Sequence, residues 1–149
     1  METTIKDIIA KYGSDPSQII AMLQDLQSAK RYLPEDDLRE LAVALEIPLA
    51  HLYRIATFFK AFSLEPKGEH IINVCVGTAC HVRGASRILN ELERQLGIAS
   101  GGTSSDQKFS LETVNCLGAC ALGPVVVVDQ EYHGDMTPGQ VDKLMENYR

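Results

Sequence analysis

The four cysteines of this 149-residue chain fall in two short segments, and this is the strongest constraint on how the chain folds. Cys75 and Cys80 lie in VCVGTAC, and Cys116 and Cys120 lie in NCLGAC. Each segment follows residues typical of a β-strand, so both pairs are expected beyond the carboxyl ends of neighbouring strands. Four thiolates gathered there would form a complete shell for a metal centre.

The spacing within each cysteine pair helps to distinguish zinc sites, redox dithiols and iron–sulfur clusters. Four residues separate Cys75 from Cys80 and three separate Cys116 from Cys120, so neither pair is a C-x-x-C zinc knuckle or a thioredoxin dithiol. A C-x4-C pair occurs in plant-type [2Fe–2S] proteins, although the rest of that motif is missing, and the C-x-H pairs of a Rieske site are absent. Spacing alone favours an iron–sulfur cluster, with zinc as the next alternative.

Small residues surround both pairs. Gly77, Gly84, Gly118 and Gly123 allow close backbone approach, and their N–H groups are candidates to bond to sulfur. Room for inorganic sulfide is expected beside the four small residues Thr78, Ala79, Ala119 and Ala121. For Arg83, two interpretations remain open: it offsets the negative charge of the site or contacts a partner protein, or it is an ordinary surface arginine.

The chain changes its hydrophobic period near residues 63–68. Before this segment, apolar residues recur at helical spacing in four stretches, and Pro16, Pro34 and Pro48 stand at helix starts. After it, strands are expected at 70–76, 109–114 and 125–128, with helices at 85–96 and from Pro138. The prediction is an α+β chain with a helical bundle at 1–64 and a small β-α-β-β-α sandwich at 65–149.

Composition excludes several functions. The net charge of −6 and pI near 5.1 make nucleic acid an unfavourable partner, because phosphate binding needs a basic face. Neither a signal peptide nor a run of ~20 apolar residues is present, so we expect a cytoplasmic protein in which disulfides are disfavoured. The sequence contains no G-x-G-x-x-G, Walker A motif or catalytic side-chain set. We therefore expect an electron carrier that has no catalytic residues and no nucleotide site of its own.

The residues around the cysteines resemble a known family. VGTACHVRGASRIL and NCLGACALGPVVVVD are similar to segments of the 24-kDa subunit family of NADH dehydrogenases. That family includes small subunits of NAD-linked, in some cases electron-bifurcating, hydrogenases and of formate dehydrogenases. The upstream segment LPEDDLRELAVALEIPLAHLYRIATFFKAFSLEPKGEH also resembles the family, so the resemblance covers nearly the whole chain.

The resemblance implies a fold, a cofactor and a partner. It implies a thioredoxin-like ferredoxin domain with one [2Fe–2S] cluster on Cys75, Cys80, Cys116 and Cys120. It also implies a flavoprotein partner that binds FMN and NAD(H). The segment GTACHVRGA resembles the sequences of the hydrogenase and formate dehydrogenase branches more closely than those of respiratory complex I. The alternatives are a subunit of a respiratory NADH:quinone oxidoreductase and, from another class, a zinc-stabilised interaction module.

Overall fold

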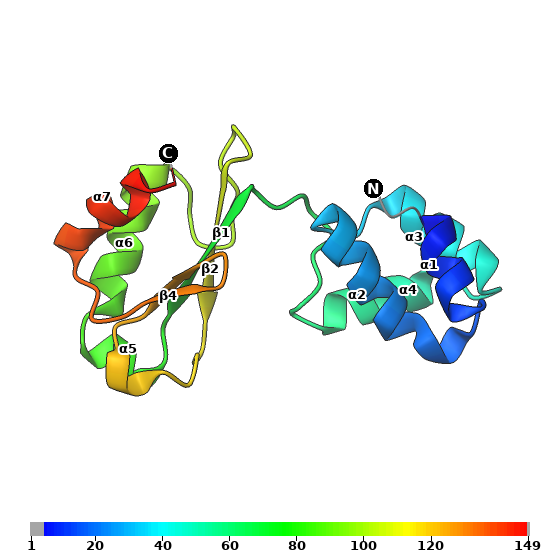
Figure 1. Ribbon diagram of the computed structural model, residues 1–149, viewed down its shortest axis with the longest axis horizontal. Coiled ribbons are helices and arrows are strands. Elements are labelled where there is room, and N and C mark those ends of the chain that lie inside the picture. The colour runs from blue at the N-terminus through cyan, green and yellow to red at the C-terminus, as the bar shows by residue number, and fades with distance from the viewer. Residues whose placement is uncertain (1–4, 149) are drawn as a thin grey trace. The chain divides into compact units, whose positions relative to one another are not determined.

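The computed structural model describes residues 5–148, which form two compact units, Met1–Pro66 and Lys67–Arg149 (Figure 1). Residues 1–4 and Arg149, at the outer ends of the predicted ranges 1–64 and 65–149, lie outside the described residues. Each unit is described by itself. No helix within residues 5–148 is long and apolar enough to cross a membrane.

The first unit is a helical bundle, as the sequence predicts. Its elements are α1 (Ile5–Tyr12), the 3-10 helix η1 (Pro16–Gln18), α2 (Ile19–Lys30), α3 (Glu35–Ala44) and α4 (Leu49–Phe58). Pro34 and Pro48 are the N-cap residues of α3 and α4. The carboxylate of Asp15 caps η1 by accepting a hydrogen bond from the backbone N–H of Ser17 at 2.9 Å.

Leucines fill the core of this bundle. Leu23 and Leu26 of α2, Leu38 and Leu41 of α3 and Leu52 of α4 are fully buried. Burying each leucine side chain contributes about 1.5–3 kcal/mol relative to leaving it exposed. Packing of these apolar stripes therefore holds together helices that are too short to be stable alone.

The second unit combines a four-stranded sheet with helices. Its elements are β1 (His70–Cys75), α5 (Thr78–Val82), α6 (Ala85–Leu96), β2 (Phe109–Val114), the 3-10 helix η2 (Cys120–Leu122), β3 (Val126–Val128), β4 (Glu131–His133) and α7 (Pro138–Glu146). The strand order is β2-β1-β3-β4, with β1 parallel to β2 and the other two pairings antiparallel. The two long helices α6 and α7 pack side by side on the same face of the sheet (Figure 1).

Alternation along the strands divides the second unit into two apolar clusters. Ile72 and Val74 of β1 pack with Val126 and Val128 of β3 in the main core, which α6 and α7 cover. Val127 points to the other face of the sheet and belongs to a smaller cluster that includes two of the cysteines. The cysteine segments are thus anchored in a packed part of the fold.

Candidate metal centre

Both cysteine segments leave the same edge of the sheet. The parallel register pairs Cys75, the last residue of β1, with Val114, the last residue of β2. This confirms the expectation that the segments follow the carboxyl ends of neighbouring strands. Cys116 comes two residues after the end of β2.

Two of the cysteines lie in short helices. Cys80 is in the middle of α5, and Cys120 is the first residue of η2. A five-residue helix and a three-residue helix are too short to leave a periodic pattern in the sequence, which is why these elements were not predicted. Both hold their cysteine on a defined backbone rather than on a mobile loop.

All four cysteines line one cavity of about 330 Å³. Its other lining residues are Gly77, Thr78, Ala79 and Asn115. Cys75 and Cys80 are each 2% exposed, whereas Cys116 and Cys120 are solvent-exposed, and all four are free thiols. The structure therefore brings the four predicted residues together in a site that is buried on one side and open on the other.

Glycines allow the two cysteine segments to approach this closely. A Cβ atom at position 77 would lie 2.5 Å from the carbonyl oxygen of Asn115, a distance that real Cβ atoms do not tolerate. A Cβ atom at position 123 would lie 3.1 Å from the sulfur of Cys80. Each segment thus carries a glycine at the point where the other segment approaches it. A larger side chain at either position would occupy space beside the cysteine sulfurs.

Two backbone N–H groups donate to the sulfur of Cys75. Burial acts to raise the pKa of the Cys75 thiol, while hydrogen bonds from the backbone N–H groups of Gly77 and Leu117 lower it. With a further hydrogen bond from Cys80, they bring the pKa of Cys75 below its ordinary value. These donors favour a thiolate at Cys75.

The sulfur of Cys116 has a similar donor. The N–H of Gly118 donates to the sulfur of Cys116 at 3.3 Å, with Gly118 in the left-handed region at a φ of 77°. Among the four glycines singled out from the sequence, Gly77 and Gly118 supply bonds to sulfur. Such bonds stabilise an anionic sulfur ligand and tune the potential of a centre that it holds.

The cysteines also disfavour one another's ionisation. Burial raises the pKa of Cys80, and its hydrogen bond with Cys75 raises that pKa further. The pKa of Cys120 is raised by its hydrogen bond and its charge interaction with Cys116. Four thiolates at this spacing need positive charge between them, and metal ions supply it because they deprotonate the thiols that bind them.

The arrangement has the features that a [2Fe–2S] cluster needs. Within residues 5–148, no group of three or more His, Cys, Asp or Glu side chains is placed to hold a single ion. Structural zinc gathers four ligands around one ion, whereas a [2Fe–2S] cluster spreads four thiolates over two irons and leaves space for sulfide. The donor set, the N–H groups and the glycine-lined cradle together fit such a cluster.

Two residues beside the cysteines have roles that sequence reasoning missed. Asn115 lines the cavity and provides the carbonyl that faces Gly77. Arg83 donates from Nη1 to the carbonyl oxygen of Gly123 at 3.1 Å, so it joins the two segments. Asn115 directly precedes Cys116 and Arg83 is three residues after Cys80, but only the tertiary structure shows these contacts.

None of the four histidines of the chain lines the cavity. His81 is exposed, and its Nδ1 lies 3.2 Å from the Oγ of Ser86. His70 stands at the opposite end of β1, where its Nδ1 lies 2.5 Å from Asp129 Oδ2. An all-cysteine donor set is therefore the one that the site offers.

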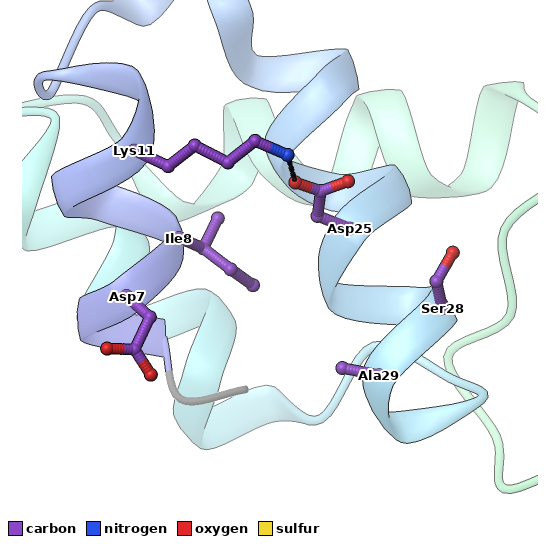
Figure 2. Close-up of a pocket in the computed structure, with 6 residues that line it drawn as sticks. All are labelled: Asp7, Ile8, Lys11, Asp25, Ser28 and Ala29. Carbon is purple, nitrogen blue, oxygen red and sulfur yellow. Dashed lines mark hydrogen bonds and ion pairs between the residues drawn. The ribbon is translucent and has the colours of Figure 1, made fainter. Parts of the chain in front are cut away.

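A second cavity, of about 440 Å³, lies in the helical unit between α1 and α2 (Figure 2). Lys11 Nζ reaches across it to Asp25 Oδ2 at 2.6 Å (Figure 2). This hydrogen bond, together with one from Tyr12, lowers the pKa of Asp25. Its lining contains neither cysteine nor histidine, so the sulfur chemistry belongs to the other cavity.

Comparisons with known proteins agree with this chemistry. The model of the thioredoxin-like [2Fe-2S] ferredoxin family matches residues 5–149. The NADP-reducing hydrogenase subunit HndA of Solidesulfovibrio fructosivorans is 39% identical over 130 residues, which are 87% of this chain and 76% of that protein. A subunit of the NADH-quinone oxidoreductase of Rhizobium meliloti (strain 1021) is 36% identical over 149 residues, 100% of this chain and 89% of that protein.

One solved structure covers both units. A chain of an NAD+-reducing [NiFe]-hydrogenase aligns with a TM-score of 0.75 at 21% identity, over 88% of this chain and 22% of its own length. At this identity the likeness shows the fold, and this chain corresponds to about a fifth of the hydrogenase chain. It confirms the predicted order of a helical region followed by the sheet domain. The chain belongs to the thioredoxin-like [2Fe–2S] ferredoxin family, and its cofactor is a [2Fe–2S] cluster.

Proposed function

We propose that Cys75, Cys80, Cys116 and Cys120 hold the single [2Fe–2S] cluster. The observation that carries this proposal is the cavity that all four cysteines line. When bound, the cluster supplies one-electron oxidation and reduction. The buried side of the site, with Cys75 and Cys80, excludes water from two ligands, and the N–H groups of Gly77 and Gly118 stabilise negative charge on sulfur.

The chain acts as an electron-transfer component of a complex of the NADH-quinone oxidoreductase or hydrogenase type. Its relatives in Solidesulfovibrio and Rhizobium carry those names and align over most of their length. We propose that it exchanges single electrons with the FMN of a partner flavoprotein that binds NAD(H). A hydride carries two electrons together, so a one-electron carrier beside the flavin allows them to be separated.

The parent complex is proposed to be an NAD-linked hydrogenase or formate dehydrogenase. The GTACHVRGA segment supports this choice, as does the 39% identity to a hydrogenase subunit. A respiratory NADH:quinone oxidoreductase is the second candidate, favoured by relatives of that type that align over nearly the whole chain. The zinc-stabilised module has no support from the family match.

Purification without oxygen tests the cluster and its ligands. The expected result is a coloured protein with two irons and two acid-labile sulfides per chain and a spin-one-half EPR signal on reduction. The Cys116→Ser variant should lose most of the cluster and, because cluster binding is coupled to folding, should melt at a lower temperature. A colourless protein with stoichiometric zinc and no sulfide would contradict the proposal.

Co-purification tests the partner. A tagged chain expressed in its native host should bring down an FMN-containing protein, together with hydrogenase or formate dehydrogenase subunits. Recovery of quinone reductase subunits instead would favour the second candidate. A cluster-loaded chain that is purified without any flavoprotein would contradict the proposed electron exchange.

A further inference from the structure

Arg83 connects the two cysteine segments by three hydrogen bonds. It is the C-cap residue of α5, the helix that contains Cys80. Its Nη1 donates to the carbonyl oxygens of Cys120 at 3.3 Å, Ala121 at 3.4 Å and Gly123 at 3.1 Å. These three carbonyls belong to η2 and the residue that follows it, so one guanidinium joins the helix of one ligand to the turn of another.

We propose that Arg83 is a positioning residue that holds the second ligand segment, residues 116–123, against α5. The inference rests on the proposed ligand roles of the cysteines. In this proposal, Arg83 fixes the distance between Cys80 and Cys120. That distance in turn affects how tightly the cluster is retained and what its reduction potential is.

The turn that Arg83 contacts has few bonds of its own. Within η2 and its cap, the N–H of Leu122 donates to Ala119 at 3.0 Å and the N–H of Gly123 donates to Cys120 at 3.2 Å. Cys116 and Cys120 are exposed, whereas Leu117 and Ala119 are partly buried against the smaller apolar cluster. The carbonyl oxygen of Leu122 also accepts a hydrogen bond from the N–H of Asp135 at 2.7 Å, and Arg83 adds the hydrogen bonds that come from the C-cap of α5. All three contacts are made by the single atom Nη1, whose two hydrogens are shared among the three carbonyls. The rigid guanidinium holds Nη1 one bond farther from the backbone than the ammonium nitrogen of a lysine would reach.

Arg83 also places a positive charge beside the site. No lysine or arginine lines the cavity itself. A cation fixed to the backbone of Cys120 favours the reduced cluster, which carries one more negative charge. Loss of this charge should therefore shift the midpoint potential to more negative values.

Three variants separate positioning from general charge. Arg83→Gln removes both the hydrogen bonds and the charge, and Arg83→Lys keeps the charge but places it on a shorter, flexible side chain that lacks Nη1. Arg87→Gln is the matched control, because Arg87 is exposed on α6 and its side chain makes no hydrogen bond or ion pair with the described residues. All three variants are made in the full chain.

The first measurement is the loss of iron from the dithionite-reduced protein to the ferrous chelator bipyridyl. We expect Arg83→Gln to accelerate this loss about ten-fold, which corresponds to about 1.4 kcal/mol. Arg83→Lys should be intermediate in rate, with a midpoint potential close to that of the parent. Arg87→Gln should match the parent in both rate and potential.

The second measurement needs no cluster. In the apo chain, Arg83→Gln should raise amide hydrogen exchange in residues 119–123, because the turn loses the contact that fixes it. The proposal would be overturned if the Arg83→Gln and Arg87→Gln chains had equal rates of hydrogen exchange and equal rates of iron loss. It would also be overturned if Arg83→Gln shifted the midpoint potential without changing the exchange rate or the rate of iron loss. If the parent chain binds no cluster, the proposed function fails, and the exchange measurement still decides whether Arg83 clamps the turn.

Discussion

Gly77 and Gly123 set the distance between the two cysteine segments, one residue from each side. Both positions lie where any side chain would meet the other segment, Gly77 at the carbonyl of Asn115 and Gly123 at the sulfur of Cys80. The φ of Gly77 is −58°, a value that other residues adopt without strain. Space, rather than backbone conformation, therefore requires glycine at position 77.

Replacing Gly77 with alanine should push the two segments apart. The added Cβ meets backbone, which cannot rotate away as a side chain does, so we expect about 1–3 kcal/mol of lost stability in this unit. Iron content per chain should fall in parallel, because Cys75 and Cys80 move relative to Cys116. Thermal unfolding and iron analysis measure the two effects.

The matched control is Gly139→Ala. A Cβ atom at position 139 meets nothing within 4 Å, and the residue lies in the first turn of α7. Alanine there should leave the iron content unchanged and be neutral or slightly stabilising, by about 0.4–1 kcal/mol. If Gly77→Ala behaves like Gly139→Ala, the close approach is not what holds the site together.

At the scale of elements, α7 shows how a local signal fixes a boundary. Thr137 and Gln140 form a reciprocal capping box, in which the N–H of Thr137 donates to Gln140 Oε1 at 2.9 Å. Pro138 occupies the first helical position, where the backbone N–H that proline lacks would have no partner within the helix. The sequence predicts this start correctly because cap, proline and apolar positions all agree.

Removal of the cap should loosen α7 and the core that it covers. Thr137→Ala is expected to cost about 1 kcal/mol, which lowers the melting temperature by about 4–8 °C for a unit of this size. Thr137→Ser retains the hydroxyl and should cost less. Calorimetry of the cluster-loaded protein measures both variants, and an unchanged melting temperature in Thr137→Ala would show that α7 does not limit the stability of this unit.

Long elements with a clear period were predictable from the sequence, and short ones were not. The amphipathic helix α6 has the predicted bounds, Ala85–Leu96, and β2 has the predicted bounds, Phe109–Val114. The helices α5 and η2 were missed because each completes too few turns to show periodicity. The cysteines themselves were identifiable by residue type and spacing alone.

The contacts that shape the site depend on tertiary structure. The hydrogen bonds of Arg83 join residues 37 to 40 positions apart in the chain, and no local pattern encodes such contacts. The same holds for Asn115, whose carbonyl matters only because β1 and β2 are neighbours. The sequence therefore indicated the four cysteines and the glycines that let their segments approach, but not the contacts of Arg83 and Asn115.

At the scale of the whole molecule, the cluster site and the helical bundle belong to different units. The four cysteines lie in Lys67–Arg149, and each unit has its own buried core. Units with separate cores are expected to fold independently. We propose that residues 65–149 form a domain that binds the cluster without the bundle, and that residues 1–64 form the second domain.

The start of the cluster domain is anchored by the linker residues themselves. The N–H of Gly68 donates to the buried hydroxyl of Ser110 at 2.8 Å, and Lys67 Nζ lies 2.5 Å from Glu112 Oε1. Gly68 also lies against the backbone of Phe109, so close that a Cβ would be 2.6 Å from its carbonyl carbon. These contacts tie the linker to β2 beside its first residues.

A fragment of residues 65–149 should therefore fold and take up the cluster with the EPR signal of the full chain. A fragment of residues 71–149 is the matched test of the anchor, because it retains all four cysteines but leaves the buried hydroxyl of Ser110 without the Gly68 donor. That hydroxyl keeps its hydrogen bond with Thr103 Oγ1 at 2.7 Å, so the shorter fragment loses the Gly68 hydrogen bond and the Lys67–Glu112 ion pair. A hydrogen bond contributes about 0.5–1.5 kcal/mol, so the shorter fragment should melt at a lower temperature. Failure of both fragments to fold, with the full chain intact, would mean that the cluster domain needs the helical bundle for its stability.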